Sequence, residues 1–439
     1  MKTKALQLYG VLLAVIFAGV VIHAPLSVWL GTVFPEQELL IKSWKEILLV
    51  LLLPLGCWLA INSGLHKKLA KDMLVRLIVL YALLHLFLVA VFRLPLFATL
   101  AGLSIDLRYI LFFALVYIVV SLLPEWRRTY LKIFFGMAAL SLLFTLFQIF
   151  LLPRDFLAIL GYSKDTIAPF LTVDNNPEYV RVNGTFRGPN PLGAYGIVVL
   201  GILSAASIRG HVVMRWAAQR AAAIGGSIAA AIAIYASYAR SALGGAGIAL
   251  AVVGIVGFGR RLRVRTWIAG GVAVVVIVLG GFLVLKDTSF VQHVLLHEDP
   301  NGKSLMSSNE GHVESLIDGT ERMLRQPLGA GPGSTGSASL FSDKPVIIEN
   351  QYLFVAHESG WLGLGIFVAI FAIILHRLWR RRKDWLALGV FASGCGLAAI
   401  GLLLPVWADD TVSIVWWGLA AIVLASPLKK GEYGRKSTN

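Results

Sequence analysis

The sequence predicts an all-α membrane protein, a polytopic bundle of about twelve transmembrane helices in which residues 1–439 form a single integral membrane domain. The chain is 57% hydrophobic and only 14% charged, whereas soluble proteins carry about 25% charged residues. Uncharged runs of about 18 residues or more, long enough to cross a bilayer, recur along the whole length. These runs do not alternate apolar and polar residues, so they are not typical of transmembrane strands.

The expected spans are the uncharged runs between polar segments. They cover roughly 6–23, 44–63, 73–92, 108–123, 132–152, 190–208, 217–238, 241–259, 266–285, 350–375, 385–406 and 412–428. The first span has no small-residue cleavage site directly after it, so we interpret it as a retained helix.

The distribution of basic residues predicts the orientation. Alternate loops contain "HKKLAKD", "EWRRTYLK", "RGHVVMRWAAQR", "RRLRVR", "HRLWRRRKD" and "KKGEYGRK". Since cytoplasmic loops are rich in Lys and Arg, we expect both termini in the cytoplasm. The net charge of +15 then reflects topology and gives no reason to expect a nucleic-acid partner. Two long loops, 153–189 and 286–349, lie on the extracytoplasmic side, where a site is most easily built.

Three arginines are expected on that side. Arg181 and Arg187 lie in "EYVRVNGTFRGPNPLGAYG", where Gly and Pro bend the chain before a helix. The simpler alternative is a surface turn with solvated arginines. Arg240 joins two spans in "IYASYARSALGGAGIAL" and is expected to be partly buried at the membrane boundary. An ionisable residue at that depth is a functional candidate, and the alternative is a side chain that extends to the interface.

The second long loop predicts an amphipathic helix near 311–326 in "SSNEGHVESLIDGTERMLRQPLGAGPGS". Arg322 has Asp318 at i−4, so an ordinary helix-surface ion pair is a strong alternative to a binding role. His312 has no such partner, and the N-terminal end of the helix is expected to keep its imidazole neutral. "LGAGPGS" lacks the ending of a nucleotide-binding loop and is interpreted as a turn.

No metal or other cofactor is predicted. His293 and His297 are spaced i, i+4 but lack a third ligand. The two cysteines, Cys57 and Cys395, lie in apolar runs and are expected to be inert packing residues.

The stretch "IIENQYLFVAHESGWLGLG", residues 347–365, carries polar residues into a membrane span. Glu349 at its outer mouth is the candidate base. Glu358 lies about 13 Å deeper if the segment is helical, and is expected to pair inside the bundle with His357 or an outside arginine. Asn350 and Tyr352 are either substrate-orienting groups or membrane-interface residues.

These residues suggest a chemistry. Arginine binds diphosphate through two hydrogen bonds and stays charged. A neighbouring carboxylate or neutral imidazole can take the proton of an attacking hydroxyl. Together they predict glycosyl transfer from a polyprenyl-diphosphate sugar to a hydroxyl, with arginines stabilising the leaving diphosphate.

Four segments, "NGTFRGPNPLGAY", "SYARSALGG", "RQPLGAGPGS" and "ENQYLFVAHESGWLGLG", occur in an order that resembles the O-antigen ligase/polymerase family of bacterial membrane proteins, over roughly 178–376. The resemblance implies a GT-C-like bundle in the bacterial inner membrane that needs no metal. It also implies an undecaprenyl-diphosphate-linked oligosaccharide donor, a glycan or lipid-linked hydroxyl acceptor and contact with membrane lipids.

The resemblance also implies roles for residues. Arg240 is similar to the family's diphosphate-binding arginine, and His312 or Arg322 occupies the place of a second one. Glu349-Asn350, nine residues and a Gly-x-x-Gly stretch from Gly360 match the last motif, but Glu349 stands where a ligase has histidine. It would act as a base if its surroundings raised its pKa. These departures favour a polysaccharide polymerase, or a ligase for another acceptor, over a lipid A-core ligase.

The alternative is a transporter or flippase of lipid-linked oligosaccharides. A transporter needs polar residues near the midplane and access from both sides. The sequence instead predicts Arg181, Arg187, Arg240, His312 and Glu349 on one face, which favours the enzyme. A receptor or scaffold would not need arginine at membrane depth.

Overall fold

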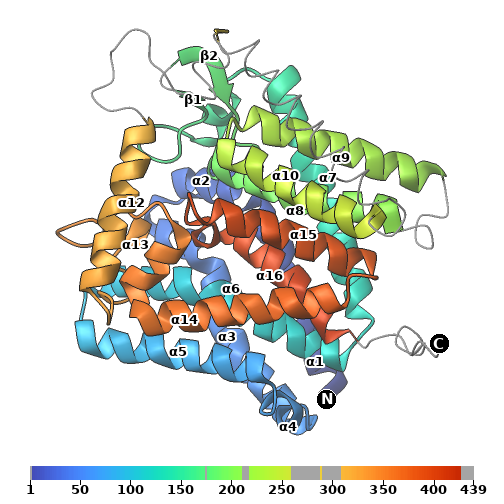
Figure 1. Ribbon diagram of the computed structural model, residues 1–439, viewed down its shortest axis with the longest axis vertical. Helices are drawn as coiled ribbons and strands as arrows, with labels where there is room; N and C mark the ends of the chain where they lie inside the picture. The colour runs from blue at the N-terminus through green and yellow to red at the C-terminus, as the bar shows by residue number, and fades with distance from the viewer. Residues whose placement is uncertain (1, 174–175, 210–216, 259–286, 289–307, 427–439) are drawn as a thin grey trace.

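The computed structural model describes residues 2–173, 176–209, 217–258, 287–288 and 308–426, and these are mostly helical (Figure 1). The first half contains α1 (Lys2–Gly19), η1 (Val20–Ile22), α2 (His23–Val33), η2 (Pro35–Gln37), α3 (Glu38–Asn62), α4 (His66–Leu69), α5 (Met73–Phe92), α6 (Leu96–Leu122), α7 (Trp126–Phe150), η3 (Phe156–Leu160), β1 (Leu171–Val173) and β2 (Asn176–Arg181). The second contains α8 (Pro189–Arg209), α9 (Ala217–Ala236), α10 (Arg240–Phe258), α12 (Ser308–Arg325), α13 (Gly336–Ser339), α14 (Gln351–Arg380), α15 (Trp385–Ile400), η6 (Val406–Ala408) and α16 (Asp410–Ala425).

Within these ranges, nine helical segments are long and apolar enough to cross a membrane, and α15 and α16 are shorter apolar helices. The chain is therefore a multi-pass membrane protein built as a helix bundle, as predicted. The expected span at 266–285 falls outside the described residues, so the count of about twelve remains a prediction.

Two helices begin well before their expected spans. The span predicted at 108–123 is the second part of α6, which begins at Leu96, and the span predicted at 44–63 belongs to α3, which begins at Glu38. In each case charged residues stand at or near the expected start of the span, Asp106 and Arg108 in α6 and Lys45 in α3. These side chains are buried against partners of opposite charge, so the helices continue through them.

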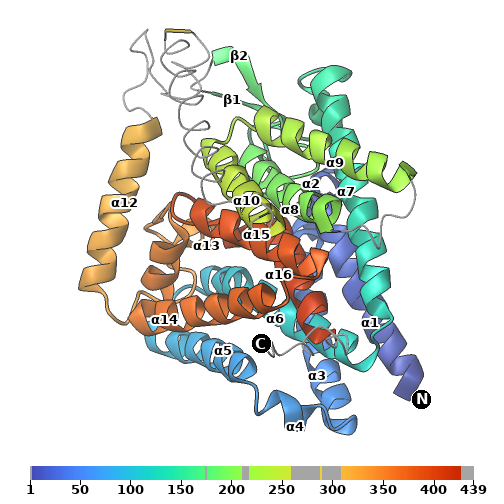
Figure 2. The same ribbon diagram turned by 45° about the vertical axis from the view of Figure 1, so that its right-hand side comes forward.

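The centre of the bundle is α16, which lies between α6, α14 and α15 in both views (Figures 1 and 2). All of its residues from Thr411 to Leu424 are buried. An aromatic cluster packs at this level, with ring centroids 5.0 Å apart for Tyr109 and Trp417 and 5.2 Å for Trp407 and Trp416. Such a cluster gives the centre a large area of close apolar contact.

Helices α8, α10 and α15 pack closely through small residues. A Cβ added to Gly396 of α15 would lie 2.4 Å from the carbonyl oxygen of Gly245 in α10, so the two backbones approach as closely as small-residue membrane interfaces allow. On the periphery, apolar side chains such as Phe87 of α5 and Ile228 of α9 are exposed. Exposed apolar side chains on helices of this length are expected to face lipid.

Helix α14 is broken at Gly360, where φ is 68° and ψ is −172°. The segment 327–335, which the sequence presents as a turn, packs into this break. A Cβ at Gly360 would lie 2.4 Å from the carbonyl oxygen of Pro327, so glycine is required both for the backbone conformation and for the close approach.

Backbone hydrogen bonds join the inserted segment to the broken helix. The bonds run from the N–H of Ala330 to the oxygen of His357 (2.6 Å), from the N–H of Gly331 to the oxygen of Glu358 (3.0 Å) and from the N–H of Trp361 to the oxygen of Pro327 (3.0 Å). They satisfy backbone groups that the break would otherwise leave unpaired inside a membrane protein.

The two segments predicted as long loops contain regular structure. The first, 153–189, carries η3 and an antiparallel pair in which Leu171 of β1 faces Arg181 of β2. The second contains α12, which confirms the amphipathic helix expected near 311–326 and begins three residues earlier, at Ser308. Figure 1 shows α12 and α13 at one end of the bundle and α4 toward the other.

Candidate functional site

An imidazole–carboxylate pair joins α12 to the start of α14. His312 Nδ1 lies 2.5 Å from Glu349 Oε2, and both side chains are 38% exposed. The backbone N–H of Glu349 also donates to Ser315 Oγ at 3.0 Å, one turn further along α12. The amphipathic helix α12 therefore holds His312 next to the start of α14.

This pair reverses both pKa expectations drawn from the sequence. The hydrogen bond that His312 donates to the Glu349 carboxylate raises the pKa of His312 above 6.5, although burial and Arg240 oppose this shift. The expectation that the helix end keeps this imidazole neutral is therefore wrong, because the carboxylate has the larger effect. The same hydrogen bond lowers the pKa of Glu349, so the raised pKa expected of a glutamate base is also wrong.

The shifts fix the pH range in which the pair stabilises the fold. The pKa of His312 is raised in the folded protein, so its contribution is complete below 6.5 and is lost as the pH rises through the folded value. The pKa of Glu349 is lowered, so its contribution is complete above 4.5 and is lost as the pH falls through the folded value. The contribution of the pair to stability is therefore greatest between these two pH values.

Arg240 lies near this pair, and Arg181 is hydrogen-bonded to the turn that precedes Arg240. Arg181 at the end of β2 donates from Nε to the carbonyl oxygen of Ser237 (2.9 Å) and from NH2 to Asn190 Oδ1 (2.6 Å). Ser237 begins the turn between α9 and α10, three residues before Arg240. Arg240 is half-buried, as expected, and its charge is felt at His312. Arg240 thus lies close to the imidazole–carboxylate pair, and Arg181 holds the turn that carries Arg240.

Arg322 has the helix-surface partner that the sequence offers as the simpler explanation. Its Nε donates to Asp318 Oδ2 at 2.7 Å, one turn earlier on α12. His357 is buried in α14, and its Nδ1 has no hydrogen-bond partner in the described part of the chain.

Asn350 and Tyr352 make hydrogen bonds that shape the start of α14. Asn350 caps the helix, because its Oδ1 accepts from the N–H groups of Tyr352 (2.9 Å) and Leu353 (3.0 Å). Its Nδ2 donates to the carbonyl oxygen of Leu402 at 2.8 Å. The Tyr352 hydroxyl donates to the carbonyl oxygen of Ala398 at 3.0 Å. Both side chains therefore orient the polypeptide that carries Glu349.

Glu358 pairs inside the bundle, but not with the expected partners. Its Oε1 accepts from the backbone N–H groups of Gly333 (3.1 Å) and Thr335 (3.2 Å), and the Asp106 carboxyl lies within hydrogen-bonding distance. Among the described residues neither His357 nor an arginine bonds to it, because the inserted segment 327–335 supplies the N–H groups that bind this carboxylate.

A third buried group extends this cluster. His85 of α5 is fully buried, and its Nε2 lies 3.3 Å from Asp106 Oδ2. The sequence analysis did not select His85 or Asp106. The sequence could have pointed to both, since each is a titratable residue within an apolar run. Burying such a side chain in a membrane costs free energy, so its presence there suggests a function.

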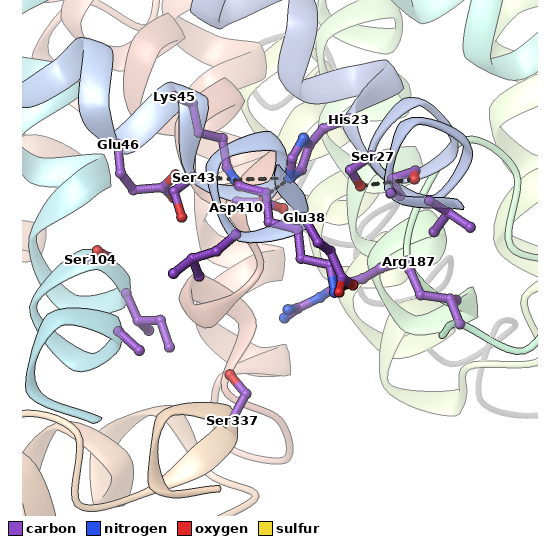
Figure 3. A pocket seen from close by; sticks show the side chains of 18 of the residues that line it. His23, Ser27, Glu38, Ser43, Lys45, Glu46, Ser104, Arg187, Ser337 and Asp410 are labelled. Atoms are coloured by element: carbon purple, nitrogen blue, oxygen red, sulfur yellow. Dashed lines mark hydrogen bonds and ion pairs between the residues drawn. The ribbon is translucent and has the colours of Figure 1, made fainter. Parts of the chain in front are cut away.

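Arg187 lies in a different place from Arg181 and Arg240. Its Nε is 3.1 Å from Asp409 Oδ2, and its NH2 donates to the carbonyl oxygen of Ala408 at 3.4 Å. It lines a pocket with residues of α2, α3, α6, α13 and α16 (Figure 3). The five residues predicted on one face are thus divided between two regions, with Arg187 in the second.

No group of three or more His, Cys, Asp or Glu side chains in the described ranges is placed to hold a metal ion. Cys57 and Cys395 are both free thiols. His293 and His297 fall outside the described residues.

No protein-family profile and no curated protein sequence matches the chain.

Proposed function

We propose that the protein transfers a glycan from a polyprenyl-diphosphate carrier to a hydroxyl acceptor, as a polysaccharide polymerase or an O-antigen-ligase-like enzyme. The observation that carries the proposal is the His312–Glu349 pair with the charge of Arg240 close to it. A base and a group that stabilises diphosphate are the two components that the reaction requires. The sequence resemblance supports the same reaction, in the bacterial inner membrane with an extracytoplasmic site and cytoplasmic termini.

The pKa directions assign the roles within the pair. Glu349 is a weakened base, whereas the carboxylate makes the neutral imidazole of His312 a stronger one. Glu349 accepts the Nδ1 proton of His312 and so directs Nε2 outward. His312 is therefore the proton acceptor in the proposed reaction, and Glu349 is the residue that orients it.

The proposed step balances as follows. The acceptor hydroxyl oxygen forms a bond to the anomeric carbon while the bond from that carbon to the diphosphate oxygen breaks. The hydroxyl proton passes to His312 Nε2, and the electron pair leaves with the lipid diphosphate. Arg240, with Arg181 beside it, stabilises the charge that develops on the leaving group.

A reconstitution experiment tests the proposal. Purified protein in liposomes, given an undecaprenyl-diphosphate oligosaccharide and a hydroxyl acceptor, is expected to release free lipid diphosphate and a longer or transferred glycan in equal amounts. Both products can be measured by mass spectrometry. Liposomes without protein serve as the control, and release of diphosphate without a new glycosidic bond would contradict the proposal.

A specific observation favours a second candidate, the transporter or flippase. His85, Asp106 and Glu358 form a buried titratable cluster within membrane-spanning helices, next to the break in α14. Buried acids and broken helices are typical of transport sites. The same liposomes separate the two functions, because movement of intact donor between leaflets without glycan transfer would support the transporter.

The pH dependence of transfer tests the role of Glu349. Neutral His312 is required, so kcat/KM is expected to rise with pH through the raised pKa of His312. Glu349→Gln removes the negative charge, so the pKa of His312 falls and the acidic limb moves to lower pH. Glu314→Gln, on the exposed face of the same helix, is the control and leaves the limb in place. An unmoved limb in Glu349→Gln would show that the pair does not set this pKa.

A further inference from the structure

The pocket that contains Arg187, here called the outer pocket, has a volume of about 790 Å³. Its walls are α2, the first turns of α3, the first turns of α6, α13 and the start of α16. Figure 3 shows Arg187 extending from the segment before α8 toward the centre of the pocket, with Lys45 and His23 on the opposite side. Its charged residues come from segments far apart in the sequence, which the fold brings to one end of the bundle.

The outer pocket is lined by charged side chains of both signs. Its lining includes four basic side chains, Lys42, Lys45, Arg108 and Arg187, and three acidic ones, Glu38, Glu46 and Asp410. Asp409, which pairs with Arg187, is a fourth acidic side chain beside the pocket.

The acidic residues hold the buried cations in place. Asp410 Oδ2 lies 2.9 Å from Lys45 Nζ, and Glu46 contacts both Lys45 (3.3 Å) and Arg108 (3.4 Å). Lys45 and Arg108 are only 3% and 8% exposed. These ion pairs offset the cost of burying the two cations when no ligand is bound.

Donor groups remain after these contacts are made. Nε of Arg108 is buried and has no hydrogen-bond partner in the described part of the chain. Arg187 is 47% exposed, and its contacts in the described residues, to Asp409 and to the carbonyl oxygen of Ala408, use Nε and NH2. A buried donor without a partner is rare in proteins and points to a ligand or an ordered water.

One wall of the outer pocket is apolar and exposed. Phe97 (58% exposed) begins α6, Phe341 (55%) and Leu340 (63%) follow α13, and Leu39 (57%) begins α3. Phe97 and Leu39 lie at the ends of helices that are long enough to cross a membrane. A charged floor beside an exposed apolar wall fits an amphiphile whose headgroup carries an anion.

We propose that the outer pocket binds the phosphate headgroup of a membrane lipid, with the phosphate on Arg187 and Arg108 and the lipid chain along the Phe97 wall. Guanidinium groups match phosphate oxygens in geometry and charge. The bound lipid phosphate would take up the spare donors of Arg108 and Arg187.

The outer pocket is separate from the His312–Glu349 pair. Ile105 lines the pocket and packs in a small apolar cluster with Ala338 and Ile348, and Ile348 directly precedes Glu349. This cluster lies between the two regions, so binding in the pocket does not depend on the proposed glycan transfer.

Native mass spectrometry of the full-length protein in neutral detergent tests the proposal. The probes are dioleoyl phosphatidic acid, dioleoylglycerol with the same chains but no phosphate, and inorganic phosphate. Dioleoyl phosphatidic acid is expected to bind at least tenfold more tightly than the other two probes, since its charge and its acyl chains both contribute to binding. Arg187→Gln is expected to weaken the binding of phosphatidic acid about tenfold. Ser104→Phe, which fills the pocket without changing a charge, is expected to weaken it similarly.

Two controls make the result specific. Arg325→Gln removes an exposed arginine on α12, and Arg240→Gln removes one beside the His312–Glu349 pair. Both are expected to retain the affinity. Equal binding of dioleoylglycerol would show an apolar site only, and equal binding of inorganic phosphate would show a site for the free ion. Unchanged affinity in both pocket variants, or loss in Arg240→Gln instead, would overturn the proposal.

Discussion

His312→Gln is expected to reduce glycan transfer by about 10²–10⁴-fold, the usual contribution of a general base. Glutamine is of similar size and keeps a hydrogen-bonding group near Glu349, but it cannot take the proton of the acceptor hydroxyl. Because His312 is partly exposed on α12, the substitution is expected to leave the fold intact. The measurement is the initial rate of glycan transfer in the reconstituted liposomes.

Arg240→Gln is the companion variant in this experiment. It removes the positive charge that is proposed to stabilise the leaving diphosphate and keeps the base, His312. It is expected to reduce the rate about 10²–10³-fold, as the loss of an electrostatic stabiliser does. Arg322→Gln is the matched control, since Arg322 is paired with Asp318 on the helix surface. A full rate in both His312→Gln and Arg240→Gln would place the chemistry elsewhere in the protein.

Gly360→Ala is expected to have the largest effect on stability, about 3 kcal/mol or more, because backbone strain and a steric clash act together. The backbone at Gly360 has φ 68°, which L side chains rarely adopt, and the added Cβ would lie 2.4 Å from the carbonyl oxygen of Pro327. Relief of this clash would push out the segment 327–335 and break its hydrogen bonds to α14. The yield of monodisperse protein and the Tm in detergent are both expected to fall.

The same helix supplies the control for this prediction. A Cβ at Gly365 of α14 would meet no atom within 4 Å, so Gly365→Ala is expected to raise the Tm slightly, as Gly to Ala does inside a helix. Equal Tm values for Gly360→Ala and Gly365→Ala would show that α14 is not broken at Gly360.

Much of the architecture is predictable from composition and periodicity. The uncharged runs locate most of the long helices, and the i, i+3, i+4 pattern locates α12. These predictions succeed because they depend on local properties, namely the cost of exposing backbone to lipid and the amphipathic period of a helix. The starts of α3 and α6 were placed too late because charged residues, Lys42 and Asp106, stand just ahead of the expected spans.

The candidate site was predictable in its residue types but not in its pairings. The sequence singled out His312, Glu349 and Arg240 separately, and gave both His312 and Glu349 pKa directions opposite to those of the folded pair. A pKa depends on which charge lies within a few ångströms, and the partner of His312 is 37 residues away in the chain.

By itself, then, the sequence determined that the chain is a multi-pass helical membrane protein, and it selected the polar residues at one end of the bundle as the candidates for function. Only the tertiary structure decided which of these charges meet: Arg187 joins Lys45 and Arg108 in the outer pocket, and Glu358 meets Asp106 and the segment inserted at Gly360. The physical reason is the distance over which each kind of interaction acts. Hydrophobic burial is set by each stretch of sequence alone, whereas ion pairs and hydrogen bonds act over a few ångströms between segments that only the packing of helices brings together.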